Sequence, residues 1–244
     1  MKIMTLNVNV FRGRVKEHVP DEVCLDNMRQ IKELIDKVII NKNDIIILQE
    51  IPHKIFKSGG GWFDNPLYNR FNELFQEYKI LKPKYLVNSW KCTVAICRED
   101  SLWGILSKNL LHYDTKYSYG NRIVELQCQD VSLLGVHVKP EDGMWDLLLP
   151  ALKDAPYTYV VGDFNANEKR GDMSGKPKEI RNCGYNNLIP NNIVTCYSYN
   201  TPIDNIYINS SFTIDKNVAV KVKDTNLTDH ALCILEYDFE YTSL

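Results

Sequence analysis

The sequence predicts an α+β fold in which two packed β-sheets carry helices on their outer faces. A helical pattern directly follows the first strand, which favours helices packed outside sheets. Many short strand patterns then follow one another, which favours a sandwich of two sheets. The 244 residues contain no repeat, no low-complexity tract and no separating linker. We therefore expect residues 1–244 to form one domain.

The first part of the chain combines strands with amphipathic helices. Met28, Ile31 and Ile35 recur at helical spacing, which predicts a helix over 26–40 with Asp26 as a possible cap. The other elements predicted here are a strand over 2–10, a wholly apolar strand over 44–48, a loop over 58–66 and a helix over 67–78.

Strand patterns dominate the rest of the chain. The predicted strands cover residues 91–97, 102–106, 121–127, 131–138, 157–161, 203–208, 217–222 and 231–238. One short helix is expected over 144–153. Polar residues are frequent over 168–187, so this segment is predicted to be rich in loops.

Composition limits the functional class and the compartment. Hydrophobic residues make up 44% and charged residues 25% of the chain, as in soluble globular proteins. The formal net charge of −2 gives no overall basic signature, so nucleic-acid contacts would depend on local patches. No apolar run is long enough to span a bilayer, and the N-terminus turns polar too early for a signal peptide. Seven scattered cysteines without a C-x-x-C pair are typical of reduced thiols, so the predicted location is cytoplasmic.

Residues 159–165 show how a strand can position catalytic groups. Val and Tyr favour a stiff buried strand, whereas the Gly162-Asp163-Phe164-Asn165 segment favours the turn that follows. A carboxylate and an amide are thus expected two residues apart at a rigid strand end. This arrangement suits a base that activates water, beside a neutral hydrogen-bond donor.

Five other segments share this design, in which an apolar strand ends in a polar residue. Together the six segments supply Asn7 with Asn9, Glu50, His137, Asp163 with Asn165, Asp204, and Asp229 with His230. Strand ends that point one way out of a sandwich converge on a common rim. The resulting carboxylates, amides and imidazoles suit a hard cation such as Mg²⁺. They also suit hydrolysis of a phosphate ester, in which charge on the non-bridging oxygens must be stabilised.

In this order the motifs resemble the endonuclease/exonuclease/phosphatase superfamily. They are L-N-x-N at 6–9, Q-E at 49–50, G-x-H at 135–137, G-D-F-N at 162–165, I-D-x-I at 203–206 and T-D-H at 228–230. The resemblance runs from Lys2 to about Leu235. It implies the deoxyribonuclease I-like fold, a four-layered αββα sandwich of two mixed sheets flanked by helices.

The resemblance also implies a metal site. Glu50 would be the main ligand with Asn7 beside it, and Asn9 and Asp229 would lie at the metal rim. The implied ion is Mg²⁺, for which Mn²⁺ is a possible substitute.

A second set of residues would act on the substrate and the attacking water. By the resemblance, Asp163 would orient or deprotonate the water, and Asn165 would hold it or a phosphoryl oxygen. His137 and His230 would contact the scissile phosphate, and Asp204 would fix the tautomer of His230. The sequence leaves open whether Asp163 or the His230–Asp204 pair is the general base.

Two positions depart from the family pattern. His137 stands where the abasic-site endonuclease branch typically has tyrosine, which disfavours abasic-site repair. The deoxyribonuclease, sphingomyelinase and phosphoinositide-phosphatase branches fit better. Asn205 follows Asp204 where relatives often carry an aromatic residue, so this rim is expected to have a different shape.

Basic and aromatic residues near these motifs indicate the kind of substrate. Arg122, Lys169 and Arg170 are candidates for binding flanking phosphates. Aromatic candidates for stacking on bases are Phe11, Trp62, Phe63 and Trp145. Three interpretations stay open: a Mg²⁺-dependent phosphodiesterase acting on nucleic acid, a phosphatase or phosphodiesterase for a small-molecule or lipid head-group phosphate, and a non-catalytic binding module.

Overall fold

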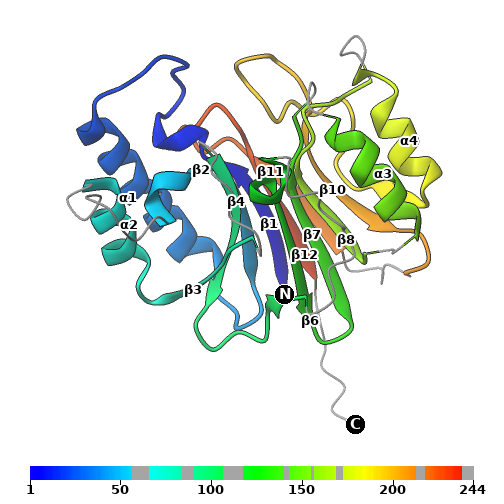
Figure 1. The fold of residues 1–244 in the computed structure, drawn as a ribbon, viewed down its shortest axis with the longest axis horizontal. Coiled ribbons are helices and arrows are strands. Elements are labelled where there is room, and N and C mark those ends of the chain that lie inside the picture. The colour runs from blue at the N-terminus through cyan, green and yellow to red at the C-terminus, as the bar shows by residue number, and fades with distance from the viewer. Residues whose placement is uncertain are drawn as a thin grey trace.

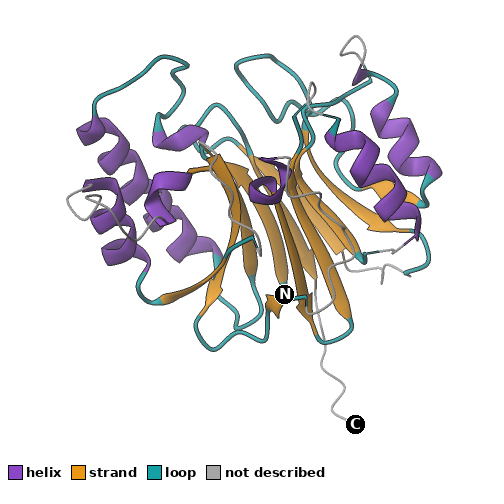
Figure 2. Cartoon of the chain, viewed as in Figure 1, coloured by secondary structure: helices purple, strands orange, loops and turns teal. Residues whose placement is uncertain are grey.

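Two six-stranded β-sheets pack face to face, with helices on both outer faces (Figures 1 and 2). The structure is a computed structural model, and it describes residues 1–56, 66–83, 91–106, 118–139, 143–154, 157–168, 173–212 and 218–237. Helices α1 (Asp21–Val38) and α2 (Pro66–Phe75) cover one sheet. Helices α3 (Met144–Asp154) and α4 (Lys176–Asn182) cover the other. The predicted four-layered αββα sandwich is therefore confirmed.

The first sheet has the strand order β11-β12-β1-β2-β4-β3. Its central strands β1 and β2 are parallel, and the other neighbours are antiparallel. The strands are β1 (Lys2–Asn7), β2 (Ile45–Pro52), β3 (Tyr78–Leu81), β4 (Lys91–Arg98), β11 (Val218–Lys223) and β12 (Leu232–Tyr237).

The second sheet has the order β5-β6-β7-β8-β10-β9 and repeats this plan. Its central strands β7 and β8 are parallel, and its other pairs are antiparallel. The strands are β5 (Gly104–Ile105), β6 (Ile123–Cys128), β7 (Val131–His137), β8 (Tyr159–Asp163), β9 (Tyr185–Asn187) and β10 (Asp204–Asn209).

The alternation of side chains along each strand explains the layers. Ile45 and Ile47 of β2 point into the core between the sheets, whereas Ile46 and Leu48 point toward α1 and α2. Because successive side chains of a strand face opposite sides, a strand buried on both faces has an apolar residue at nearly every position. The run at 45–48 is such a strand.

Two glycines of the second sheet allow the close packing that this architecture needs. At Gly135 of β7, a Cβ atom would lie 2.7 Å from Val124 and 2.8 Å from Ile47 of the opposite sheet. Gly162 of β8 has φ +146°, and a Cβ there would lie only 1.9 Å from the carbonyl oxygen of Val136. Only glycine fits this position directly before Asp163.

The helix α1 begins earlier than predicted. It starts at Asp21 after Pro20, so Asp26 lies inside the helix, where it binds Arg29 and Gln30. The predicted Asp26 cap is therefore wrong. The first strand also ends earlier, at Asn7, and a 3₁₀ turn follows at Asn9–Phe11.

The segment 168–187 holds more regular structure than predicted. It contains helix α4 and strand β9, so the prediction of a loop-rich segment is wrong for residues 176–182 and 185–187. Pro177 in the first turn and the buried Ile180 explain the short helix. Its other residues are mostly polar, so the sequence shows no helical pattern of apolar residues. Strand β3 was not predicted, and its Tyr78 lies at the end of the predicted helix over 67–78. Residues 58–65 of the predicted loop lie outside the described residues, and Pro66 begins α2.

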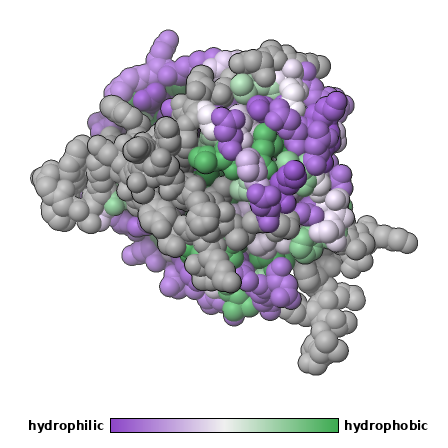
Figure 3. Space-filling model, turned by 45° about the vertical axis from the view of Figure 1, so that its right-hand side comes forward, coloured by the Kyte–Doolittle hydropathy of each residue, from purple (hydrophilic) through white to green (hydrophobic). Residues whose placement is uncertain are grey.

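On the face in Figure 3, hydrophilic side chains surround small hydrophobic areas. Among the described residues, no helix combines the length and apolar character needed to cross a membrane.

Replacing Gly162 with alanine should strongly destabilise the sandwich, because the new methyl group would collide with the backbone of β7. We expect the free energy of unfolding of Gly162→Ala to fall by about 3 kcal/mol or more in chemical denaturation. Gly104→Ala is the matched control, since no atom lies within 4 Å of a Cβ there. Equal stabilities of the two variants would contradict the close approach.

Candidate active site

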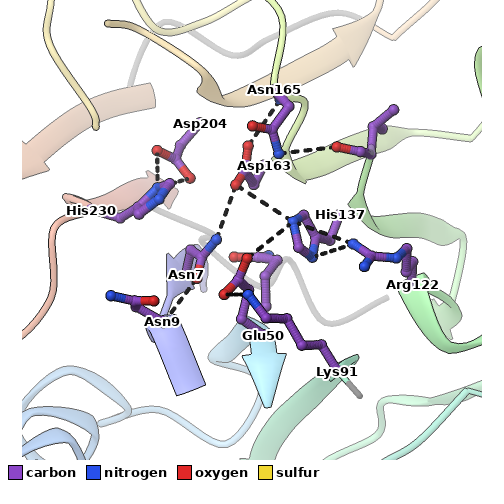
Figure 4. A network of polar contacts seen from close by, with 12 residues as sticks. Asn7, Asn9, Glu50, Lys91, Arg122, His137, Asp163, Asn165, Asp204 and His230 are labelled. Atoms are coloured by element: carbon purple, nitrogen blue, oxygen red, sulfur yellow. Dashed lines mark hydrogen bonds and ion pairs between the residues drawn. The ribbon is translucent and has the colours of Figure 1, made fainter. Parts of the chain in front are cut away.

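The candidate residues meet at one edge of the sandwich, where the central strands end (Figure 4). Within each sheet, the parallel register pairs Asn7 with Gln49 and His137 with Asp163. The carboxyl ends of both central strand pairs therefore contribute to the same edge. All of the side chains labelled in Figure 4 come from this region.

Asp163 forms the central contact of this edge. Its Oδ2 accepts a hydrogen bond from Asn7 Nδ2 across 3.0 Å, which joins the two sheets. Its Oδ1 accepts from the backbone N–H of Asn165 at 2.9 Å. Asn165 adopts a left-handed backbone conformation (φ 49°), and its amide donates to Val138 O. Both carboxylate oxygens of Asp163 are therefore held in fixed directions.

The environment of Asp163 favours its protonated form. The pKa of Asp163 is raised to about 7. Burial is the largest cause, and the negative charge of Asp204 is the second. The positive charge of His230 and the hydrogen bonds from Asn7 and Asn165 act in the opposite direction. A carboxylate with such a pKa can exchange a proton near neutral pH.

His230 pairs with Asp204 on the neighbouring strand β10. Its Nδ1 lies 2.8 Å from Asp204 Oδ2 and 3.0 Å from Oδ1. Thr195 Oγ1 accepts the backbone N–H groups of Ile203 and Asp204, which fixes the start of this strand. Burial disfavours the imidazolium, yet the charge and hydrogen bond of Asp204 raise the pKa of His230 well above its ordinary value.

His137 lies on the opposite side of the site and is neutral. Arg122 Nη1 lies 2.9 Å from His137 Nδ1. Burial and then the positive charge of Arg122 hold the pKa of His137 well below its ordinary value. The same Nη1 lies 3.4 Å from Nε2. Because a guanidinium only donates, the shorter contact assigns Nδ1 as the acceptor and places the ring proton on Nε2. This Nε2 lies 3.5 Å from Glu50 Oε1 and 3.9 Å from Asp163 Oδ2.

Glu50 occupies a bulge in strand β2. The register with β4 shifts between Leu48 and Ile51, so that Gln49 and Glu50 together oppose Thr93. Glu50 also has φ +60°, an uncommon conformation for a residue with a side chain. A bulge redirects a side chain at a strand end. Here it brings the carboxylate of Glu50 to the site edge, where 14% of its side chain is exposed.

Three residues without a predicted role also contact this site. Lys91, the first residue of β4, forms an ion pair with Glu50. Cys196 forms an isolated β-bridge with His230, and its Sγ lies within 4.8 Å of a ring nitrogen of His230. Thr228 Oγ1 donates to Asn7 O and so links β1 to the segment before β12. The T-D-H motif signals Thr228, but no local pattern marks Lys91 or Cys196.

Asn9 and Asp229, which were predicted at the metal rim, lie beside the contacts of Asp163, His137 and Glu50. Asn9 Nδ2 donates to Gly13 O and Val15 O, so this amide supports the following loop. Asn7 Oδ1 accepts the backbone N–H of Asn9. Asp229 is buried, and its carboxylate lies within 4.8 Å of ligand atoms of Cys196 and His230.

The donor set at this edge fits a hard divalent cation. Glu50, Asn7 and Asp229 offer carboxylate and amide oxygens, which Mg²⁺ prefers. Ligand atoms of Asp163, Asp204 and His230 also lie within 4.8 Å of one another. Buried carboxylates at such spacing repel one another and are stabilised by added positive charge. The residues present therefore fit a divalent metal ion.

Some predicted substrate contacts have other positions. Arg122 is buried and contacts His137, and its role in binding a substrate phosphate stays a prediction. Phe11 and Trp145 are buried in the cores under α1 and α3, so the prediction that they stack on bases is wrong. Lys169, Arg170, Trp62 and Phe63 lie outside the described residues.

Solved structures share this architecture along nearly the whole chain. An AP endonuclease from Archaeoglobus fulgidus superposes with a TM-score of 0.62 at 16% identity, covering 98% of this chain and 100% of the other. The 3'-5' exonuclease NExo from Neisseria meningitidis gives 0.62 at 15% identity, with the same coverage. The chain has the deoxyribonuclease I-like fold.

The same fold occurs in the endonuclease domain of TRAS1, a telomere-specific non-LTR retrotransposon. That structure has a TM-score of 0.59 and 12% identity and covers 96% of both chains. No protein-family model and no curated protein sequence matches this chain. The deoxyribonuclease I-like fold, which the resemblance to endonuclease/exonuclease/phosphatase proteins implies, is thus confirmed.

Removing the charge of Asp163 should stabilise the protein at neutral and higher pH. The pKa of this carboxyl group is higher in the folded protein than in the unfolded chain. Above pH 7 the group must ionise inside the protein, which destabilises the folded state. We expect Asp163→Asn to raise the free energy of unfolding by about 2–4 kcal/mol at pH 8.

The gain should shrink as the pH falls from about 7 and vanish below about pH 3, where the wild-type carboxyl group is protonated in both states. Denaturant titrations of both proteins without added metal measure it. A gain that is independent of pH would contradict the raised pKa.

Proposed function

We propose that this protein is a metal-dependent phosphoester hydrolase, in the first instance a phosphodiesterase acting on nucleic acid by attack of water. One observation carries the proposal. Strand-end residues from both sheets meet in one network, in which Asn7 binds Asp163 between the sheets. Polar residues that merely end separate strands would have no reason to bond across the two sheets. The bond between Asn7 and Asp163 is instead expected for one site that both sheets build.

Glu50 and Asn7 are the residues that would hold the ion. When bound, Mg²⁺ or Mn²⁺ supplies positive charge for phosphoryl oxygens that become more negative during the reaction. Glu50 suits this role because it is partly exposed at the edge and aimed there by the bulge in β2. Asp229 and Asn9 complete the proposed rim.

Asp163 is the proposed general base. The hydrogen bonds from Asn7 and Asn165 direct its oxygens, and its pKa near 7 matches proton transfer at neutral pH. His230 carries the raised pKa of an imidazolium, so it is already protonated at neutral pH and cannot accept a further proton. This difference favours Asp163 over the His230–Asp204 pair as the base.

The two histidines would act on the phosphate in different charge states. His230, held by Asp204, would donate to the phosphate or the leaving oxygen as a cation. His137 would donate from Nε2 as a neutral group, because Arg122 occupies Nδ1. Arg122 would therefore act through His137, and Asn165 would hold the attacking water or a phosphoryl oxygen.

Nucleic acid is the proposed substrate class. Supporting it, proteins of the same fold include an AP endonuclease, a 3'-5' exonuclease and a retrotransposon endonuclease domain. The second candidate is a phosphatase for a small or terminal phosphate ester. It is favoured by another structure of this fold, a Neisseria 3' phosphatase bound to product DNA.

Hydrolysis by the purified protein tests the proposal. We expect cleavage of plasmid DNA or a labelled oligonucleotide with Mg²⁺ or Mn²⁺, and its loss with excess EDTA. Asp163→Ala should reduce the rate by about 10³-fold or more. If only a small monoester is hydrolysed, the second candidate replaces the first. If cleavage persists in EDTA, the metal-assisted mechanism is wrong.

The His230–Asp204 pair makes a separate prediction. Asp204→Asn should lower kcat by about 10²- to 10⁴-fold, because His230 loses the charge that keeps it protonated and oriented. Asp44→Asn is a matched control: Asp44 is also fully buried, but it binds backbone N–H groups at the start of β1 and before β2. It should lower stability and leave kcat unchanged. Equal kcat values for both variants would exclude the proposed pairing role.

A further inference from the structure

Lys91 forms a direct ion pair with the carboxylate that is best placed to hold a metal ion. It is the first residue of β4 and pairs in register with Pro52 of β2. From there its ammonium reaches back to Glu50 Oε2 (Figure 4). The chain thus places a positive charge of its own on the principal candidate ligand.

Both oxygens of Glu50 have neighbours in this arrangement. Lys91 contacts Oε2, and the Nε2 of His137 lies 3.5 Å from Oε1. A divalent ion that binds the carboxylate must share or replace these neighbours. An ammonium and a divalent cation on one carboxylate also repel each other at short range, most strongly where little water screens them.

Lys91 can leave this position more easily than Arg122. About 31% of the Lys91 side chain is exposed, whereas the Arg122 residue is 4% exposed and held against His137. A lysine ammonium ends a flexible four-carbon stem and is strongly hydrated, so it can turn toward solvent at little energetic cost. Glu50 lies on the bulge of its strand, so the partly exposed Lys91 is the member of the pair whose side chain can turn away.

We propose that Lys91 is an internal competitor for the metal ion: it binds Glu50 when the site holds no divalent cation and releases it when one binds. Lys91 thus acts through Glu50 and sets the affinity of the site for metal. The inference rests on the proposed function, since it takes Glu50 as the metal ligand.

Direct metal binding tests this competition without any substrate. Mn²⁺ is titrated into the purified, metal-free protein, and free Mn²⁺ is followed by electron paramagnetic resonance. We expect Lys91→Met to bind Mn²⁺ on the order of tenfold more tightly than wild type, because the competing charge is gone. Lys91→Arg keeps the charge and should stay close to wild type. Glu50→Gln should lose the site in either background.

Lys221→Met is the matched control. Lys221 also forms an ion pair with a glutamate, Glu236, between neighbouring strands of the first sheet, on β11 at its edge. Its removal should leave Mn²⁺ affinity unchanged. Thermal unfolding gives a second readout, in which Mn²⁺ should raise the Tm of Lys91→Met more than that of wild type.

The proposal fails if Lys91→Met binds Mn²⁺ no more tightly than wild type, or if neither protein binds it. Failure of the proposed function has a different signature. Tighter Mn²⁺ binding by Lys91→Met together with no phosphoester hydrolysis by wild type would uphold the competition and reject the enzymatic role. Hydrolysis by wild type with unchanged Mn²⁺ affinity in Lys91→Met would do the reverse.

Discussion

The face-to-face packing of two sheets through one apolar layer fixes where every described candidate residue lies. Ile45 and Ile47 from the first sheet meet Val124 and Val161 from the second in this layer. Gly135 permits the approach, since a Cβ there would collide with Ile47. Each sheet also has a parallel pair at its centre, so the polar ends of β1, β2, β7 and β8 contribute to one edge. The bond between Asn7 and Asp163 depends on this alignment.

The polar edge concentrates buried charge, which explains its contacts. Asp163 and Asp204 would destabilise the sandwich as unpaired ions. Asn7 and Asn165 hold the first, and His230 pairs with the second. The same surroundings shift the pKa values of the three groups in different directions: upward for His230 and Asp163, and downward for His137. These are the shifts that the proposed mechanism requires.

Local sequence patterns predicted the layers and the residues at the strand ends. Alternating and continuous apolar runs located most strands, and the ordered polar ends identified Asn7, Glu50, His137, Asp163, Asp204 and His230. Contacts made by pairing of distant segments were not accessible in this way. Lys91 reaches Glu50 only because β4 lies antiparallel to β2. The bulge at Gln49 and Glu50 contains no glycine, so the sequence gives no local signal for it. The contact between Arg122 and His137 depends likewise on the pairing of β6 with β7, which no local pattern shows. Helix α4 escaped prediction because one buried face is too short for a helical period to be recognised.

In the proposed mechanism, water directed by Asp163 attacks phosphorus in one step while the histidines hold the phosphate. The stereochemical course at phosphorus tests it most directly. A dinucleotide phosphorothioate of one configuration is hydrolysed in ¹⁸O-labelled water with a divalent metal, and the configuration of the product is determined. A single in-line displacement predicts inversion, with one ¹⁸O atom in the product thiophosphate. Retention of configuration would show two displacements through a covalent enzyme intermediate, and would contradict the account.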